Sequence, residues 1–396
     1  MSLNSTPSSN RIHIGLFGKR NAGKSSIINA ITGQNLAIVS DVKGTTTDPV
    51  SKAMELLPLG PVVIIDTPGL DDEGELGALR IQKAYQTLNK TDIAILVIDS
   101  HIGITKEDTA ILERIIAKEI PYVIVFNKSD LASSFELPDH ISKENSIFTS
   151  TVTGENIFEL KELIAKQIPQ DVQEKHIVSD LIKPNDFVIL VVPIDASAPK
   201  GRLILPQQQT IRDLLEAGAV SIVVQENELK QTIEDLGKKP ALVITDSQAF
   251  KQVSALVPKD IPLTSFSILF ARYKGNLKTV VHGAHALDTL NDGDTILISE
   301  GCTHHRQCED IGTVKLPRWL KKHSGKELNY EFTSGTEFPV DLSKYKMIIH
   351  CGGCTLNERE MKYRLKCAED QNIPITNYGT AIAHMNGILE RSIEML

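Results

Sequence analysis

Residues 18–25 have the sequence Gly-Lys-Arg-Asn-Ala-Gly-Lys-Ser and directly follow an apolar run at Ile12–Phe17. This is the G-x-x-x-x-G-K-[ST] pattern in the strand–loop–helix setting of a phosphate-binding loop. The glycines let backbone N–H groups curl around phosphate oxygens, and the next helix N-terminus favours the same negative charge. The pattern predicts that Lys24 reaches the β- and γ-phosphates while Ser25 binds magnesium. The expected contact residues are Gly18, Asn21, Ala22, Gly23, Lys24, Ser25 and Ser26.

A second motif, Asp66-Thr67-Pro68-Gly69, ends another apolar strand candidate, Val62–Asp66. A carboxylate there can reach the magnesium shell, and the Gly69 N–H can reach the γ-phosphate. We therefore expect a phosphate-hydrolysing group. Its expected members are Lys24, Thr46, Asp66 and Gly69, with Ser25, Thr46 and Asp66 around the magnesium ion.

The base specificity is predicted by Asn127-Lys128-Ser129-Asp130, which ends the strand candidate Tyr122–Asn127. An aspartate can accept hydrogen bonds from both N1–H and the N2 amine of guanine, and adenine offers no such pair of donors. A buried carboxylate left unpaired by adenine disfavours ATP. Residues 150–154 resemble the loop that completes such a base pocket. The expected guanine contacts are Asn127, Lys128, Asp130 and Ser150.

Apolar runs alternate with helical patterns throughout the chain, which predicts an α/β fold with a mostly parallel, doubly wound sheet in the nucleotide-binding part. A second βα series has no glycine-rich phosphate loop, and a third region contains every cysteine. The expected organisation is a disordered tail at 1–10, a P-loop GTPase domain at 11–170, a linker at 171–184, and two smaller α/β domains at 185–270 and 271–396.

Composition narrows the classes of partner. The formal net charge is -8, which argues against a broad nucleic-acid surface, since such surfaces are normally basic. The longest apolar runs, such as Ile93–Ile98 and Phe187–Pro193, fall far short of the ~20 residues that span a bilayer. We expect a cytoplasmic protein without nucleic-acid or membrane partners.

The five cysteines all lie at or beyond residue 302, which indicates metal binding or redox chemistry rather than a disulfide framework. Cys302 and His304 follow the strand candidate Thr295–Ser299, and His350-Cys351-Gly-Gly-Cys354 ends the candidate Met347–His350. Residues at the carboxyl ends of neighbouring strands converge in one crevice. Three thiolates and an imidazole suit either structural zinc or an iron–sulfur cluster, and both remain open on the ligand set alone. Cys308 and Cys367 are interpreted as ordinary small residues.

The nucleotide motifs resemble those of the TrmE–Era–EngA–septin GTPases, on the basis of Asn21 and of Gly44-Thr-Thr-Thr-Asp48. The resemblance implies that Asn21 helps to hold a potassium ion in place of an arginine finger, with slow intrinsic turnover. Asn21 as a plain turn residue is the alternative. Thr46 is the preferred magnesium contact, with Thr45 as the alternative. Leu70 stands where Ras-like proteins position water with glutamine. Four acids could serve instead, and the spacing selects none: Asp71, Asp72, Glu73 and Glu75.

Cys-x-His followed by His-Cys-x-x-Cys behind such a GTPase, with the stretch Pro193–Gln207 between them, resembles the HydF family of FeFe-hydrogenase maturation GTPases over roughly residues 11–395. The resemblance implies a 4Fe–4S cluster on Cys302, Cys351 and Cys354, with an exchangeable fourth position for which His304 or His350 is the candidate. It also implies a homodimer through 185–270 and cluster binding by 271–396. The implied role is a scaffold that receives a di-iron precursor from two radical-SAM maturases and delivers it to the apo FeFe-hydrogenase.

Two other functions are consistent with part of the sequence. One is a TrmE/Era-like RNA- or ribosome-associated GTPase with structural zinc, which the acidic charge and the lack of a recognisable RNA-binding module disfavour. The other is a redox enzyme using the Cys351/Cys354 dithiol. That function leaves Cys302 and His304 unexplained, and no thioredoxin-like context precedes the pair.

Overall fold

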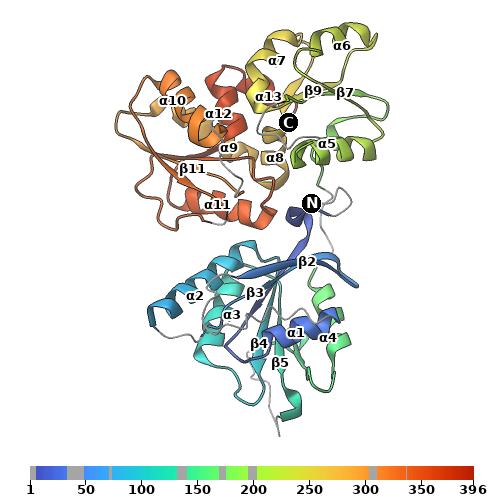
Figure 1. The fold of residues 1–396 in the computed structure, drawn as a ribbon, viewed down its shortest axis with the longest axis vertical. Coiled ribbons are helices and arrows are strands. Elements are labelled where there is room, and N and C mark those ends of the chain that lie inside the picture. Colours follow the sequence, from blue (N-terminus) through green and yellow to red (C-terminus); the bar gives the residue numbers. More distant parts are fainter. Residues whose placement is uncertain are drawn as a thin grey trace. The chain divides into compact units, whose positions relative to one another are not determined.

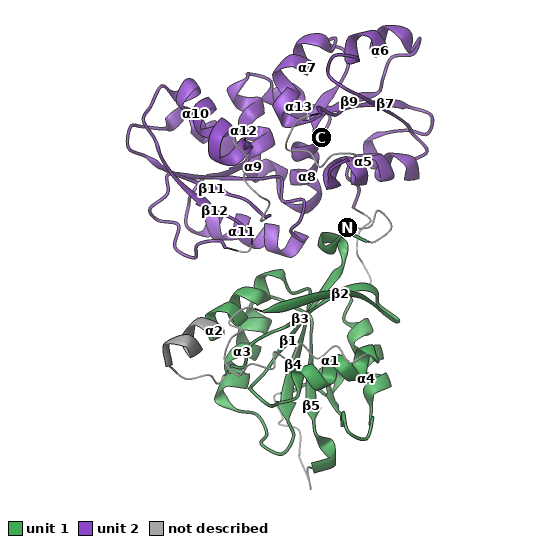
Figure 2. Cartoon of the chain, viewed as in Figure 1, with its two compact units in different colours: residues 1–172 green, residues 173–396 purple. Residues whose placement is uncertain are grey.

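The structure is a computed structural model of the 396-residue chain. It describes residues 6–33, 49–70, 74–131, 141–168, 175–194, 203–302, 310–335 and 337–396, with backbone only for 74–80. The chain divides into two compact units, Met1–Val172 and Gln173–Leu396 (Figure 2). Each unit is described by itself.

Unit 1 is built on a six-stranded sheet with the strand order β2-β3-β1-β4-β5-β6 (Figure 1). All neighbouring strands are parallel except β2, which runs antiparallel to β3. The fully buried central strands are rich in isoleucine and valine, as expected of a parallel sheet covered on both faces. The strands are β1 Ile12–Phe17, β2 Val50–Leu56, β3 Gly60–Asp66, β4 Ile93–Asp99, β5 Tyr122–Asn127 and β6 Ser146–Phe148.

Helices cover both faces of this sheet, so the predicted doubly wound fold is confirmed. Ile27 and Leu160, from two different helices, belong to one apolar core, and Ile111 belongs to the core on the opposite face. Between β1 and the first helix the chain has room only for the phosphate loop. The helices are α1 Lys24–Thr32, α2 Gly74–Thr87, α3 Lys106–Ala117 and α4 Ile157–Lys166.

Two details of unit 1 differ from expectation. Strand β2 was not predicted, because as an edge strand it exposes most of its side chains and has no strong apolar run. The disordered tail predicted at 1–10 does not extend to residue 10. Ser8–Asn10 form a 3-10 helix, and Ser9 is buried. The Arg11 guanidinium fixes this segment by donating to the carbonyls of Thr6, at 3.0 Å, and Met54, at 2.8 Å.

Unit 2 contains two four-stranded sheets with equivalent topology, β10-β9-β7-β8 and β12-β11-β13-β14, and every pair is parallel. In each sheet the first strand lies beside both the second and the third, so the strand order reverses next to it. The predicted pair of smaller α/β layers is therefore present. The strands are β7 Phe187–Val191, β8 Val220–Val224, β9 Leu242–Thr245, β10 Leu263–Ser265, β11 Thr295–Ser299, β12 Asn329–Thr333, β13 Met347–His350 and β14 Ile375–Asn377.

The last helices join the two sheets of unit 2 into one body. Ala383 and Leu389, near the C-terminus, belong to the same buried core as Ile189 and Val243 of the first sheet. The chain turns at Gly387, with φ 69°, and this turn separates the last two helices. The helices are α5 Leu205–Glu216, α6 Leu229–Asp235, α7 Phe250–Leu256, α8 Phe266–Lys274, α9 Leu277–His285, α10 Leu316–Ser324, α11 Glu358–Asp370, α12 Tyr378–Met385 and α13 Leu389–Ile393.

The linker expected at 171–184 is wrong for its second half. Ile177, Val178 and Ile182 are buried in the core of unit 2. The Asp213 carboxylate accepts the backbone N–H groups of Val178 and Ser179, each at 2.8 Å. These three apolar residues were not recognised as core residues because polar residues surround them in the sequence. Residues 171–174 lie outside the described part of the chain.

Candidate functional site

The phosphate loop connects β1 to α1, and its lysine is held inside it. The buried Lys24 ammonium donates to the carbonyl oxygens of Gly18 and Lys19, at 2.8 Å each. These bonds place the positive charge within the loop whose backbone N–H groups would surround a phosphate. The position agrees with the predicted role of Lys24.

The base motif supports the phosphate loop directly. The Asn127 amide donates to the Ala22 carbonyl at 3.0 Å, across a separation of more than a hundred residues. Gly23, at φ 99°, lies under this contact, and a Cβ there would stand 2.1 Å from the Asn127 nitrogen. Only glycine fits this backbone conformation and this space. Asn127 therefore positions the loop.

Two of the three predicted magnesium residues, Ser25 and Asp66, lie together. The Ser25 hydroxyl donates to Asp66 Oδ2 at 2.9 Å. Burial raises the pKa of Asp66, although the Ser25 hydroxyl and the nearby Lys24 oppose the shift. The other carboxylate oxygen, Oδ1, is buried and has no hydrogen-bond partner among the described residues. A buried unpaired oxygen is costly, and Mg²⁺ prefers oxygen ligands, so the residues fit this ion. Thr46 and Thr45 lie outside the described residues.

Three of the predicted guanine residues, Asn127, Lys128 and Asp130, line the same pocket as the phosphate loop. Asp130 is exposed, and its Oδ1 accepts the Ser150 hydroxyl at 2.6 Å. Lys128 pairs with Asp99 at 2.5 Å. Asp99 was missed, although its place at the end of the apolar strand β4 is a usable signal. The predicted residues that line this pocket are Asn21, Gly23, Lys24, Ser25, Ser26, Asp66, Gly69, Asn127, Lys128 and Asp130.

The segment after Gly69 is described only in part. Leu70 is buried in the core with Phe17 and Leu88, so its side chain does not face the phosphates. Asp71, Asp72 and Glu73 lie outside the described residues, as does the side chain of Glu75. Asn21 is exposed at the rim with φ 62°, a conformation that asparagine tolerates well.

The predicted cysteine site lies where the strand order of the second sheet reverses. β11 and β13 are parallel neighbours, with Ser299 opposite His350. The Gly301 N–H donates to Cys351 Sγ at 3.0 Å, and Thr355 donates to the Gly301 carbonyl at 2.9 Å. The backbone immediately before Cys302 therefore touches the Cys351 sulfur. His304 and Cys308 lie outside the described residues.

Cys351 is half-buried and packs against the apolar core of the second sheet. Burial raises the pKa of its thiol to about 11, although the N–H groups of Gly301 and Gly353 favour the thiolate. Burial also raises the pKa of Cys354, and the Lys274 charge opposes that shift. The Gly353 N–H is 3.4 Å from Cys351 Sγ, and Gly353 adopts φ 63°. A metal supplies the charge that would stabilise such thiolates, so the residues fit a metal centre.

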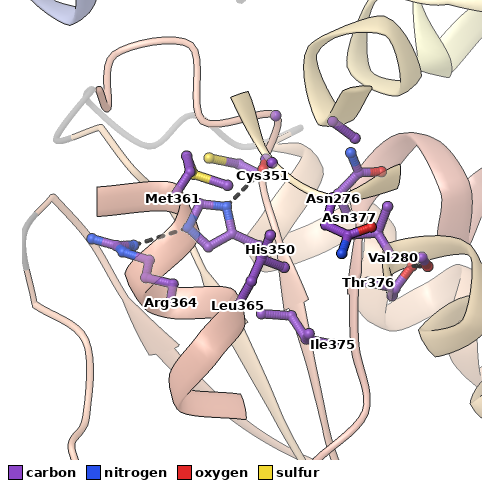
Figure 3. Close-up of a pocket in the computed structure, with 13 residues that line it drawn as sticks. Asn276, Val280, His350, Cys351, Met361, Arg364, Leu365, Ile375, Thr376 and Asn377 are labelled. Atoms are coloured by element: carbon purple, nitrogen blue, oxygen red, sulfur yellow. Dashed lines mark hydrogen bonds between the residues drawn. The ribbon is translucent and has the colours of Figure 1, made fainter. Parts of the chain in front are cut away.

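His350 is held on both sides (Figure 3). Arg364 can only donate, so Nε2 of His350 accepts from its Nη1 at 2.9 Å, and Nδ1–H donates to the Cys351 carbonyl at 2.7 Å. Burial and then the Arg364 charge lower the pKa of His350 to about 3, which keeps the ring neutral. Both ring nitrogens are therefore engaged away from the sulfur.

Among the described residues, Arg364 is the largest side chain that is fully buried. It also donates to Glu360 at 3.0 Å, to the Ser299 hydroxyl at 3.3 Å and to the Gly335 carbonyl at 2.7 Å. Sequence reasoning missed it, because a Glu–Arg pair four residues apart is typical of a solvated helix face. The available signal is that Glu360 and Arg364 fall on the apolar stripe of α11.

Lys274 was also missed, and no local pattern identifies it. Its ammonium is buried at the end of α8 and donates to the carbonyls of Cys354, at 3.0 Å, and Leu356, at 2.9 Å. Burial lowers the pKa of Lys274 to about 8, although Cys354 and Cys351 oppose the shift. A cation therefore lies directly against the backbone of the cysteine loop. Cys367, in contrast, packs against an apolar core.

Three family models match the chain. A 50S ribosome-binding GTPase model matches residues 13–128, a hydrogen maturase F dimerization domain matches 177–275, and a hydrogen maturase F tetramerization domain matches 278–395. Among curated relatives, the tRNA modification GTPase MnmE of Nitrosomonas eutropha is 33% identical over 158 residues, which are 40% of this chain and 35% of that protein. GTPase Der of Kosmotoga olearia is 34% identical over 175 residues, 40% of this chain and 39% of that protein. This chain thus spans well under half the length of these relatives.

Among solved structures, Era of Aquifex aeolicus bound to GDP and AlF4⁻ is 22% identical, with a TM-score of 0.35, over 56% of this chain and 97% of that chain. None of the described helices is long and apolar enough to cross a bilayer.

The fold, the loop and the base motif define unit 1 as a P-loop GTPase domain. Two family-specific models follow it and together match more than half of the chain. The chain belongs to the hydrogen maturase F family.

Proposed function

We propose that this protein is a GTP-hydrolysing scaffold that carries a 4Fe–4S cluster and delivers the di-iron precursor of the FeFe-hydrogenase active site to the apo-hydrogenase. The observation that supports the proposal best is the contact between Gly301 and the Cys351 sulfur. It brings the Cys302 segment to the Cys351/Cys354 pair in a chain that also has a GTPase domain.

In this proposal Cys302, Cys351 and Cys354 bind three irons of the cluster, and the cluster offers one iron with an exchangeable ligand. Hydrogen bonds to sulfur and nearby charge tune such clusters. The N–H groups of Gly301 and Gly353 supply the hydrogen bonds, and Lys274 supplies the charge. His304 is the preferred fourth ligand, since both nitrogens of His350 are already engaged. His350 and Arg364 act as positioning residues for the Cys351 backbone.

GTP hydrolysis is the proposed activity of unit 1. Lys24 would bind the phosphates, while Ser25, Asp66 and Thr46 would hold magnesium. Asp130 would select guanine, and the Gly69 N–H would contact the γ-phosphate. Asn21 lines the pocket, which supports its proposed contact with a potassium ion. Slow, potassium-activated turnover is part of the proposal, because Leu70 faces the core.

The proposed partners are the apo FeFe-hydrogenase and the two radical-SAM maturases. A homodimer is proposed through residues 185–270, since a dimerization-domain model matches 177–275. Higher assembly is proposed through the region of the tetramerization model. The proposed location is the cytoplasm, where thiols stay reduced for cluster binding.

The test begins with anaerobic purification and measurement of iron, sulfide and zinc per chain. The cluster-loaded protein is then incubated with the two maturases and transferred to apo-hydrogenase, and hydrogen evolution is measured. The proposal predicts nearly equal amounts of bound iron and sulfide in the wild-type protein, and activation of the hydrogenase. Cys302→Ala should lose both properties, and Cys367→Ala should retain them. Loaded protein that never activates the hydrogenase would contradict the delivery role.

One second function is favoured by a specific observation, the match of residues 13–128 to a ribosome-binding GTPase model. In that function the cysteines would hold structural zinc. Stoichiometric zinc without sulfide in the anaerobic protein, together with ribosome co-sedimentation that depends on GTP, would establish it and contradict the scaffold.

A further inference from the structure

Unit 2 contains a second cluster of side chains of the types that can bind a metal, and its residues are separate from those of the cysteine site. Asp288 lies in the 3-10 helix Ala286–Thr289, His323 in the last turn of α10, and His384 near the end of α12. The Nε2 atoms of His323 and His384 are each 2.9 Å from a different oxygen of Asp288. All three potential ligand atoms lie within 4.8 Å of one another.

A third imidazole borders this group. The ring of His285 packs edge-on against His384, with ring centroids 5.0 Å apart, and the His323 ring is 5.8 Å from the same ring. His285 and Asp288 are three positions apart on a continuous helical segment, α9 followed by the 3-10 helix, so they project from neighbouring positions. Three histidines and one carboxylate therefore gather from three chain segments.

The backbone favours a cation at the same place. The helical segment formed by α9 and the 3-10 helix ends at Thr289, α10 ends at Ser324 and α12 ends at Met385, so each contributes its C-terminal turn. Helix C-termini carry partial negative charge, which attracts cations within about one turn.

The burial of the group suits an exchangeable ion. The side chains of His384 and His323 are only 13% and 22% exposed, while that of Asp288 is 57% exposed. The two rings are therefore fixed by packing, and the carboxylate leaves one side open to solvent. Zinc ligands lie ~2.0–2.2 Å from the ion in a tetrahedron, which separates them by roughly 3.3–3.6 Å. The two imidazole–carboxylate contacts of 2.9 Å would have to lengthen, and the three ligand atoms already lie within 4.8 Å of one another, so rearrangement of these side chains alone would admit the ion.

We propose that Asp288, His323 and His384 form a zinc site that clamps three helix ends of unit 2, with His285 or water at the fourth position. Two imidazoles and a carboxylate are a common zinc set. Each Nε2 now donates to Asp288, so both rings must bind as the Nδ1–H tautomer, and no net proton is released from neutral rings. The proposal does not depend on the proposed function.

The first experiment removes competing thiolates from the full-length chain by Cys302→Ala, Cys351→Ala and Cys354→Ala. Equilibrium dialysis against zinc should then show one bound equivalent, and zinc should raise the Tm. His384→Gln and His323→Gln should each lose that equivalent. The control, His282→Gln, changes an exposed histidine of α9 and should retain it.

The second experiment covers the case in which this triple variant does not fold. Cobalt(II) is added to the cluster-loaded wild-type protein, whose cysteines are occupied. The proposal predicts visible d–d bands of tetrahedral nitrogen and oxygen coordination without thiolate charge transfer, and their loss in His384→Gln but not in His282→Gln. Absence of these bands, or bands that survive both His384→Gln and His323→Gln, would overturn the proposal.

Discussion

The nucleotide site and the cysteine site follow the same topological rule and differ in their contact with water. Both lie at the carboxyl ends of parallel strands where the strand order reverses, beside β1 in unit 1 and between β11 and β13 in unit 2. Asp130 and Asn21 of the nucleotide site are exposed, whereas His350 and Arg364 beside the cysteines are fully or almost fully buried.

The difference shows what each site is suited to bind. A nucleotide arrives as a hydrated anion, and exposed hydroxyls, amides and carboxylates can exchange with its water. The cysteine site disfavours free thiolates, so its charges need a bound metal and a fixed polar network. Changes in the nucleotide site should therefore reduce binding with little effect on stability, and changes behind the cysteines should reduce stability.

The largest expected effect lies in the exposed site. Asp130→Asn should lower the preference for GTP over ATP by at least about 10³-fold, because an amide N–H₂ donor replaces one of the two oxygens that accept from guanine. Competition binding with both nucleotides measures it, and Ser129→Ala is the matched control. The free energy of unfolding of unit 1 should change by less than about 0.5 kcal/mol. Unchanged selectivity would remove the guanine assignment.

The buried site should show the reverse behaviour. Arg364→Met should destabilise unit 2 by about 3–5 kcal/mol, because Glu360 is left buried and His350 loses its donor. Urea unfolding measures the effect, and Lys366→Met on the exposed side of α11 should cost less than about 0.5 kcal/mol. Adding Glu360→Leu should recover part of the loss. A stability loss below about 1 kcal/mol would show that the hydrogen bonds of Arg364 do not stabilise unit 2.

Lys274 sharpens the comparison, since its charge should act on the reduction potential of a bound cluster. Lys274→Met should make the cluster harder to reduce by about 60 mV, equivalent to about 1.4 kcal/mol for one electron. A potentiometric titration followed by EPR measures the shift. Lys278→Met, on the neighbouring helix α9, is the control. An unchanged potential would mean that Lys274 only holds the backbone.

The smallest expected effect concerns potassium. Replacing potassium by sodium should lower the GTPase rate by roughly threefold to tenfold, and Asn21→Ala should remove this dependence. Steady-state phosphate release at constant ionic strength measures it. If the wild-type rate does not respond to the exchange, Asn21 is a turn residue, as its positive φ alone would allow.

Much of unit 1 could be predicted because its motifs are short and local. The phosphate loop, Asp66 and Asn127 each follow an apolar strand that is visible in the sequence. In unit 2 the approach of the Cys302 segment to Cys351 could be expected because each follows an apolar strand candidate, but the positions of Arg364 and Lys274 could not. Their burial depends on which helix covers the sheet, and this depends on packing between segments far apart in sequence. Edge strands such as β2, β12 and β14 were not predicted, because they lack a long apolar run.

The central claim is that three thiolates from two strand ends bind one iron–sulfur cluster beside a GTPase domain. The most direct measurement is iron and sulfide content with EPR after anaerobic reconstitution of Cys302→Ala and of Cys367→Ala. The account predicts a wild-type 4Fe–4S signal in Cys367→Ala and no stable cluster in Cys302→Ala. A full, unaltered cluster in Cys302→Ala would contradict it.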